Sequence, residues 1–472
     1  MGPTTNAGAT PIPDFDAIII GAGMSGLAAA IRLAYFERKV LVLERHYAAG
    51  GLNSYYALGG YQFDVGLHAM TNYVPPGTRG APLTKICRQL RLTLEDFALV
   101  PQYQSEIRFP GITLRFNNDF EFFIQEVIAH FPAQKDNFLR LVRCIREYDE
   151  LDLEAKPISG RQIVSSFLTD PVLIDMLFCP LMIYGNAAEH DMEFGQFVVM
   201  FKSIFCEGLA RPREGVRRII NVLRRKVREV GGTVRMRCGV KALHVEDGRV
   251  RSVVLDNGEL LTADTILSSA GYVETLRLCD DGDPAQLAPL AGRLSFVEII
   301  SILDAPMKSL GHNSTIVFYN TEKDFHYEVP KDLVDPRSGV ICCSDNFLYT
   351  KPLPKSMIRM TCLANFDGWS TLPEADYVAA KAEWLPRIHR EVLQFIPDFR
   401  DHIVFTDFFT PRTIKYWTGH LNGAVYGMPN KRKTGRTRLE NLFICGNDQG
   451  FLGIVGAMLS GISMANLHVL KK

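Results

Sequence analysis

Three glycines near the N-terminus have the spacing of a phosphate-binding turn. Gly21, Gly23 and Gly26 follow the apolar run 17–20, and the alanine-rich segment 27–33 comes after them. In such a turn the first glycine permits a sharp bend, the second lets the backbone approach a pyrophosphate, and the third lets a helix pack closely on a strand. The free N–H groups at the start of that helix attract phosphate. The spacing therefore predicts a strand, a turn and a helix that bind a dinucleotide.

An acidic residue ends the next predicted strand. The short apolar run 40–43 is followed directly by Glu44 and Arg45. A carboxylate at this position accepts hydrogen bonds from the hydroxyl groups of a ribose. Farther along the chain, the backbone of Val240 can pair with an adenine edge. We predict that the dinucleotide contacts these residues and the glycine turn, namely Gly21, Ala22, Gly23, Met24, Ser25, Gly26, Glu44, Arg45 and Val240.

A second pattern of strand, glycine, acid and helix lies near the C-terminus. Residues 441–445 are mostly apolar, Asp448 follows them, and a helix is expected from residue 453. A nicotinamide cofactor needs only the first unit, whereas FAD extends through a ribityl chain to a flavin. Asp448 can bond a ribityl hydroxyl, and the helix N-terminus can stabilise negative charge on the reduced flavin; alternatively, Asp448 only caps a helix. We predict FAD, with contacts from Gly446, Asp448, Gly453, Ile454 and Val455.

A further glycine pair, followed by a predicted hairpin and a histidine, adds the candidate chemistry. Gly51 belongs to that pair, and two short strands then lead to His68. The pair is either a surface turn or part of the cofactor site, and we assign Gly51, Leu52, Leu67 and His68 to that site. A histidine exchanges protons near neutral pH, so His68 is the candidate catalytic residue. The alternative is a core histidine bonded to a backbone carbonyl.

Three more side chains lie in segments that can line a cavity. They are Glu298, Arg412 and Tyr416. Each is a residue type that can move protons or bind polar groups, but nothing in its spacing points to chemistry. We interpret all three as structural.

The composition is that of a globular protein with no excess charge. In 472 residues, 52 basic side chains balance 52 acidic ones, which does not favour a nucleic-acid partner. The ten cysteines form no CxxC pair and no zinc-ligand spacing. We therefore predict reduced thiols, no metal site and a cytoplasmic location.

The pattern along the chain predicts an α/β fold with two intertwined parts. One is a Rossmann-like FAD-binding domain of the glutathione-reductase type, extended by a β-meander between residues 234 and 261. The other is an inserted α+β substrate domain, rich in phenylalanine. We assign residues 1–13 to a flexible tail, 14–75, 206–290 and 425–472 to the FAD-binding domain, and 76–205 and 291–424 to the substrate-binding domain.

Two features raise the question of a membrane. The aromatic segment 194–205 precedes the run 211–230, which holds eight basic and two acidic residues. Its apolar and basic residues fall on opposite helical faces, which is typical of a solvated helix packed on a sheet. Alternatively, both segments lie against the anionic inner face of a membrane as a peripheral contact. The uncharged segment 449–467 is long enough to span a bilayer, but its glycines and polar residues favour a buried helix.

Four parts of the chain resemble the FAD-dependent phytoene desaturase superfamily, and within it the retinol saturases and plant-type carotenoid isomerases. The resemblance rests on residues 16–26 with Glu44, 50–51 with 63–68, 423–427, and 446–461. Amine oxidases of the wider superfamily place an arginine after the paired glycines, where this chain has Leu52, so an amine substrate is not expected. Desaturases often have a glycine at the position of Glu214. Many also have a His-Pro pair near residues 449–452, where this chain has Gln-Gly-Phe-Leu. The resemblance thus favours the saturase and isomerase branch over phytoene desaturation.

This resemblance implies flavin redox chemistry on C–C or C=C bonds of a hydrophobic polyene or isoprenoid. Such a substrate has no charge, so the phenylalanine-rich insertions are expected to form an apolar tunnel. Two alternatives are a redox-neutral cis–trans isomerase that uses reduced FAD and a non-enzymatic, FAD-stabilised isoprenoid carrier. Direct use of a nicotinamide is not expected, because no second GxGxxG occurs. The sequence leaves the oligomeric state open.

Overall fold

A parallel sheet of five strands forms the centre of the dinucleotide-binding part. The computed structural model describes residues 13–150 and 152–471, so all but the last residue of the predicted tail lies outside it. The strand order is β19–β13–β1–β2–β9. The strands are β1 (Phe15–Ile20), β2 (Val40–Leu43), β9 (Thr233–Arg235), β13 (Ala263–Ser268) and β19 (Leu442–Ile444).

Both faces of this sheet are covered, which explains why β1 and β2 are apolar without alternation. Ile19 packs in a core with the helices, whereas its neighbours Ile18 and Ile20 pack in a core with the meander. The helices on the first face are α1 (Met24–Ala34), α9 (Val216–Glu229) and α15 (Gly453–Ala465). The meander consists of β10 (Val240–Glu246), β11 (Arg249–Leu255) and β12 (Leu260–Leu261).

The meander has one strand fewer than predicted. The first of the expected short strands, β9, pairs in parallel with β2 and belongs to the central sheet. Gly231 and Gly232 end helix α9 and turn the chain back, so β9 lies beside β2 in the manner of a βαβ unit.

A sheet of seven strands carries the inserted part, in the order β18–β14–β17–β16–β15–β6–β7. All neighbouring pairs are antiparallel except β15 with β6. Its side chains alternate between two cores, since Ile316 and Phe318 face one side while Val317 and Tyr319 face the other. The strands are β6 (Ser105–Phe109), β7 (Ile112–Phe116), β14 (Ser295–Leu303), β15 (Ile316–Asn320), β16 (Val334–Cys343), β17 (Ser356–Ala364) and β18 (Ile403–Phe409).

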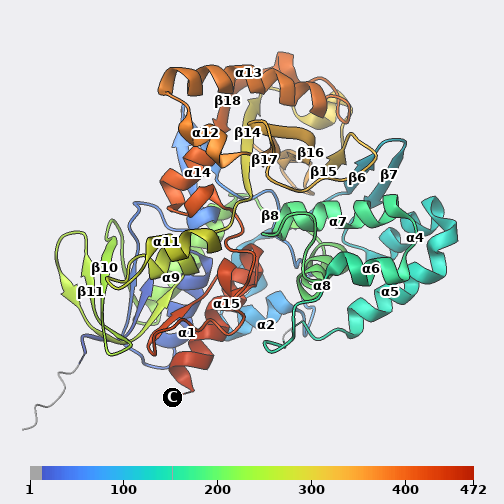
Figure 1. The fold of residues 1–472 in the computed structure, drawn as a ribbon. Coiled ribbons are helices and arrows are strands. Elements are labelled where there is room, and N and C mark those ends of the chain that lie inside the picture. The colour runs from blue at the N-terminus through green and yellow to red at the C-terminus, as the bar shows by residue number, and fades with distance from the viewer. Residues whose placement is uncertain (1–12, 151, 472) are drawn as a thin grey trace, which may run out of the picture.

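Helices cover both faces of this second sheet (Figure 1). Helices α12 (Phe366–Thr371) and α13 (Glu374–Val392) contribute to one core. A group of helices contributes to the other core, namely α4 (Phe120–His130), α5 (Lys135–Glu147), α6 (Gly160–Phe167), α7 (Pro171–Gly185) and α8 (Phe194–Phe201), with a π-helical turn at Lys202–Glu207.

Short elements join the two parts. They are β3 (Tyr55–Leu58), β4 (Tyr61–Asp64), α2 (Pro82–Leu90), α3 (Leu94–Phe97), β5 (Leu99–Pro101), β8 (Ala210–Pro212), α10 (Tyr272–Leu276), α11 (Pro284–Leu287) and α14 (Pro411–Thr418). The packing differs from the expected boundary at residue 76. Leu83 and Leu90 of α2 and Phe97 of α3 lie in the same core as α1, so these helices belong with the dinucleotide-binding part.

The aromatic segment 194–205 is mostly buried, which contradicts the alternative in which it lies against a membrane. Phe197, Phe201 and Phe205 are fully inaccessible and pack in the helical core. The basic helix α9 behaves as the solvated alternative predicts, with Ile219, Leu223 and Val227 fully buried and its arginines mostly outward. Arg211 of the same basic run precedes α9, on the short strand Ala210–Pro212, and is buried.

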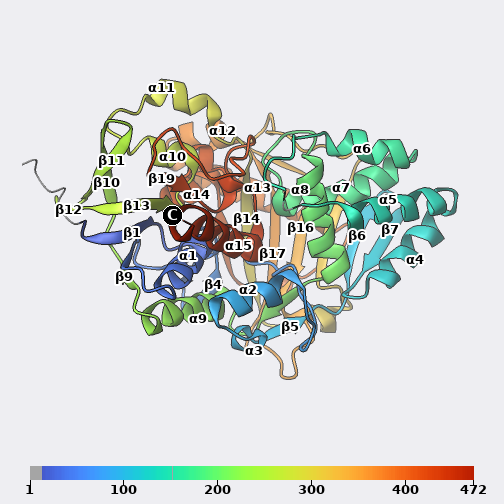
Figure 2. The same ribbon diagram turned by 90° about the horizontal axis from the view of Figure 1, so that it is seen from below.

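The apolar helix near the C-terminus lies beside α1 (Figure 2). Among the described residues, Gly453–Leu470 is the one helical stretch long and apolar enough to cross a membrane, and 61% of it is buried inside the protein. This burial is what we expect of a core helix, in agreement with the sequence.

Candidate cofactor and substrate site

The three glycines of the first turn differ in the space around them. A methyl group on Gly21 would lie 2.4 Å from Ser269 Oγ, and one on Gly26 would lie 2.1 Å from the carbonyl oxygen of Gly21. The side of Gly23 is open, with no atom within 4 Å of the place a methyl group would take. Gly21 and Gly26 are therefore required by the fold, whereas Gly23 leaves room for a ligand.

The acidic residue after β2 holds the turn in place. Glu44 accepts hydrogen bonds from the N–H groups of Ala22 (2.8 Å) and His46 (2.9 Å). The Arg45 guanidinium donates to the carbonyl oxygen of Trp417 at 3.3 Å. Lone pairs remain on the Glu44 carboxylate for a ribose, and that contact stays a prediction.

A single cavity runs from the glycine turn to His68. Of the predicted contacts, its walls contain Gly23, Met24, Ser25, Gly51, Leu52, Leu67, His68, Gly446, Asp448, Gly453 and Ile454. The predicted contacts Gly21, Ala22, Gly26, Glu44, Arg45, Val240 and Val455 lie outside these walls. Val455 is only 2% exposed and packs in the core beside α1, because it lies on the inner side of α15.

The starts of two helices face this one cavity. Gly23 precedes α1 and Gly453 begins α15, and no side chain caps the first N–H groups of either helix. Free N–H groups at a helix start favour negative charge. One helix start suits a pyrophosphate and the other suits the electron-rich edge of a flavin, so the described residues fit FAD.

Asp448 fulfils the structural role that the sequence left as an alternative. Its buried carboxylate accepts hydrogen bonds from the N–H groups of Tyr272 (2.6 Å) and Met428 (2.7 Å). Tyr272 is the first residue of α10, so Asp448 does cap a helix. The carboxylate also lines the cavity and keeps further lone pairs, so a ribityl contact stays a prediction.

His420 is a cavity residue that the sequence did not reveal. Its Nδ1 lies 3.6 Å from Glu274 Oε1, and its ring lines the cavity near Asp448. Burial opposes a charged imidazole, but Glu274 outweighs burial and raises the pKa of His420. A positive charge at this place suits an anionic pyrophosphate.

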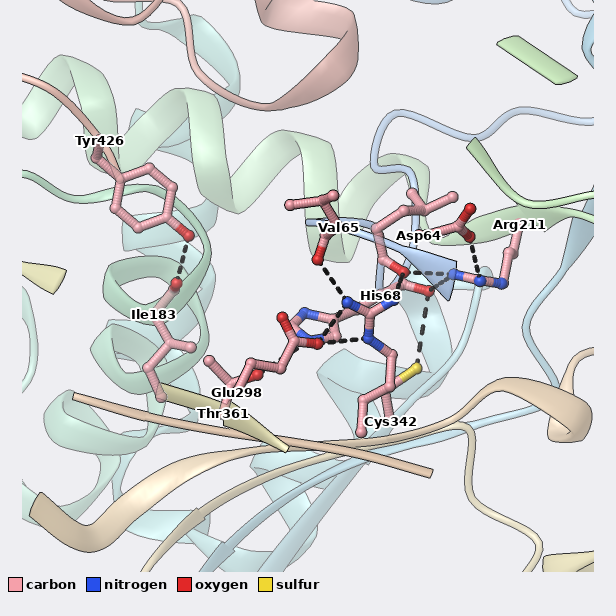
Figure 3. A network of polar contacts seen from close by, with 11 residues as sticks. Asp64, Val65, His68, Ile183, Arg211, Glu298, Cys342, Thr361 and Tyr426 are labelled. Atoms are coloured by element: carbon pink, nitrogen blue, oxygen red, sulfur yellow. Dashed lines mark hydrogen bonds and ion pairs between the residues drawn. The ribbon is translucent and has the colours of Figure 1, made fainter. Parts of the chain in front are cut away.

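His68 lies at the other end of the cavity, in contact with the second sheet (Figure 3). Its Nε2 is 3.3 Å from Glu298 Oε1 and 3.1 Å from Thr361 Oγ1. The ring of Tyr184 stacks over the imidazole, with 5.8 Å between centroids and 11° between planes. The alternative of a histidine bonded to a backbone carbonyl does not match these contacts, since its partners are side chains.

Two buried arginines hold the loop that carries His68, and Figure 3 labels one of them, Arg211. Arg359 donates to the carbonyl oxygens of Val65 (2.6 Å) and Leu67 (3.2 Å). Arg211 donates to the carbonyl oxygens of Leu67 and His68, the second at 3.1 Å. Each arginine has a carboxylate partner at 2.5 Å, Glu298 for Arg359 and Asp64 for Arg211. Two arginines, each paired with a carboxylate, thus fix the backbone of the His68 loop.

The buried charges set the protonation of this end of the cavity. Burial lowers the pKa of His68, and the neighbouring Glu298 offsets this only in part. Burial alone would raise the pKa of Glu298, but Arg359 and His68 outweigh it and hold that pKa below its usual value. Near neutral pH, Glu298 is therefore ionised and His68 is neutral.

Glu298 does line the cavity, while its interpretation as a structural residue stays a prediction; Arg359 and Thr361 were missed. Glu298 on β14 lies opposite Thr361 on β17, and Arg359 is two residues from Thr361 on the same face. This register cannot be inferred from segments so far apart in the chain. Of the other two candidates, Arg412 pairs with Glu374 and Tyr416 is 76% exposed, so neither belongs to the site.

Comparison with known proteins agrees with this architecture. Prolycopene isomerase from Arabidopsis thaliana is 24% identical over 96% of this chain and 82% of its own length. All-trans-retinol 13,14-reductase from Danio rerio is 23% identical over 97% of this chain and 87% of its own length. A solved structure of an oxidoreductase from Methanosarcina mazei, 16% identical, superposes with a TM-score of 0.66 over 97% of this chain and 100% of its own.

A family model named "Flavin containing amine oxidoreductase" matches residues 24–467. This match spans both parts of the fold and confirms the predictions of FAD and of an enzyme. The relatives confirm the resemblance drawn from the sequence motifs. The chain therefore belongs to the flavin containing amine oxidoreductase family and is an FAD-dependent enzyme.

Proposed function

We propose that this enzyme saturates or desaturates a C–C bond of a hydrophobic polyene or isoprenoid. The observation that carries the proposal is the character of the cavity around His68. Beyond the cofactor residues its walls are mainly apolar or aromatic, comprising Ile183, Tyr184, Phe296, Val340, Phe409, Ile414, Val425 and Tyr426. Such walls select a substrate by shape and apolar surface.

The one carboxylate at this end of the cavity is already neutralised. Arg359 and Glu298 form an ion pair in which Arg359 is fully buried. A cationic amine would gain little from a carboxylate that a guanidinium already pairs with. Leu52, in place of the arginine expected of amine oxidases, points the same way. An uncharged substrate fits these walls better than an amine does.

The relatives support the same class of substrate. Their names state activity on prolycopene and on all-trans-retinol. When bound, FAD accepts a hydride from a substrate carbon in desaturation or supplies one in saturation. The neighbouring carbon then loses or gains a proton, and His68, in the apolar part of the cavity, is a side chain that exchanges protons near neutral pH.

A second candidate is a redox-neutral cis–trans isomerase that uses reduced FAD. The specific observation in its favour is the similarity to prolycopene isomerase over most of both chains. An isomerase changes double-bond geometry without net consumption of electrons. The two candidates therefore differ in electron balance.

Anaerobic incubation of the FAD-loaded enzyme with a panel of polyenes and isoprenoids tests both candidates. Products are analysed for unsaturation and geometry, and the flavin absorbance is followed at the same time. A saturase or desaturase changes the number of double bonds and the flavin redox state in equal amounts, whereas an isomerase changes geometry alone. Turnover of an amine, with no reaction of any polyene, would overturn the proposal.

A further inference from the structure

We propose that Nδ1 of His68 exchanges the substrate proton and that Glu298 is the positioning residue that turns this nitrogen toward the reaction. The inference rests on the proposed function and extends it to a defined atom. It follows from the geometry of the Arg359–Glu298–His68 chain (Figure 3).

The contacts of Nε2 decide which nitrogen carries hydrogen. An ionised carboxylate only accepts hydrogen bonds, so the 3.3 Å distance from Nε2 to Glu298 Oε1 favours hydrogen on Nε2. In that tautomer, Thr361 Oγ1 at 3.1 Å accepts from the same N–H. In the neutral ring Nδ1 is then a bare lone pair, for which no partner occurs among residues 13–150 and 152–471.

The surroundings fix the ring and its charge. Tyr184 stacks on one face of the imidazole, and the loop backbone is held by Arg211 and Arg359. The titratable and charged groups that face His68 from the elements around it are Asp64 (β4), Tyr184 (α7), Arg211 (β8), Glu298 (β14), Cys342 (β16) and Arg359 (β17). Glu298 also pairs with Arg359, but its carboxylate lies 3.3 Å from Nε2 and raises the pKa of His68, which burial and the two arginines lower.

The proposed proton transfer at His68 accounts for the bonds broken and formed in both desaturation and saturation. In desaturation a C–H bond breaks, its proton goes to Nδ1, and its electron pair forms the new double bond, while the hydride of the adjacent carbon would go to FAD, which would supply the electron acceptor. The resulting imidazolium is stabilised by Glu298 through Nε2–H. In saturation the same imidazolium returns the proton from Nδ1 to carbon. Desaturation therefore needs neutral His68, and saturation needs it protonated.

Histidine NMR tests the geometry without any substrate. The chain has 11 histidines, so the His68 signals are assigned by their loss in His68→Gln. We expect neutral His68 to carry its hydrogen on Nε2, and we expect its pKa to fall in Glu298→Gln. A wild-type ring with hydrogen on Nδ1 would overturn the inference, whatever the enzyme does with polyenes.

Kinetics test the role of the proton in turnover. We expect His68→Gln to lower kcat about 100-fold with little change in KM. In Glu298→Gln the midpoint of the pH profile should move down by about one pH unit, because the anion that favours imidazolium is gone. Desaturation should rise with pH through this midpoint, and saturation should fall.

Asp407→Asn is the matched control. Asp407 on β18 is also a partly buried carboxylate on the same sheet, bonded to the Tyr56 hydroxyl at 2.7 Å, but it does not contact His68. We expect the midpoint of the pH profile of the Asp407→Asn variant to equal that of the wild type. If Glu298→Gln does not fold, Thr361→Val removes one Nε2 contact without changing charge and should weaken the tautomer preference. Equal midpoints in Glu298→Gln and Asp407→Asn would mean that Glu298 is only structural.

Discussion

Gly461 of α15 lies directly on the carbonyl oxygen of Ser25 in α1. A methyl group at Gly461 would come within 2.0 Å of that oxygen and within 3.1 Å of the Ala29 nitrogen. The two helices, separated by more than 400 residues of chain, can approach this closely only because one of them has no side chain there. This contact joins the two halves of the cofactor site.

Gly461→Ala should therefore destabilise the enzyme although alanine favours a helix. We expect a loss of more than about 2 kcal/mol in unfolding free energy, since the clash is with backbone that cannot turn away. FAD content after purification should fall as well. Gly195→Ala in α8 is the control, because its methyl would meet only side-chain atoms of Glu193 and Tyr148 at 3.0–3.3 Å. Equal stability of the two variants would contradict the packing described here.

Gly23→Ala should separate cofactor binding from folding. Nothing lies within 4 Å of its methyl position and its φ is −71°, so alanine fits the apoprotein without strain. The methyl would occupy space reserved for the pyrophosphate, so we expect the Kd for FAD to rise at least about tenfold. Thermal unfolding of the apoprotein should be unchanged. Gly26→Ala is the contrast, since its methyl would clash with Gly21 and should impair folding itself.

Glu207→Gln should change how stability depends on pH. Burial raises the pKa of Glu207 from 4.5 to about 7, and the Asn72 amide opposes this only in part. Between these values the folded state keeps a proton that the unfolded state has lost, so wild-type stability falls as pH rises through this window. Above a pH of about 7, Glu207 is ionised in both states, and the cost of burying its charge no longer changes with pH. The variant has no charge at this position, so it should be more stable by roughly 2 kcal/mol at pH 8. Chemical denaturation at several pH values checks this, with exposed Glu147→Gln as the control.

Association with the inner face of a membrane remains a proposal for the basic face of α9. Arg224→Glu with Arg225→Glu reverses two charges near the middle of that face. We expect weaker binding to liposomes that contain anionic lipid, with no change for neutral liposomes. A second double variant, Tyr416→Ser with Trp417→Ser, alters the aromatic pair on α14, of which 76% and 48% are exposed. Binding lost only in the second variant would move the contact from α9 to α14.

Local patterns predicted the cofactor part well because it is built from short-range units. The glycine turn, β1, α1 and β2 follow one another within thirty residues. Each of these segments has a composition typical of one kind of secondary structure. Strand β9 was misplaced because a short apolar run gives no information on its partner, which is set by the helix that precedes it.

The reactive end of the cavity could not be predicted in the same way. His68, Glu298 and Arg359 come from three distant segments, and only the pairing of β14 with β17 brings the last two together. Arg211 looked like part of a solvated basic run, but Asp64 draws it into the interior. A buried arginine has no local signature, because its burial depends on a partner elsewhere in the chain.

The position of β19 and α15 has a consequence for biosynthesis. The strand is the edge of the central sheet, the helix start faces the cofactor cavity, and both lie within the last 31 residues, 442–472. A nascent chain still lacking them has the phosphate turn but no surface to cover a flavin. Cofactor capture must therefore wait until this segment has been synthesised and has folded against α1, and until then the helices of the inserted part are without the bound cofactor.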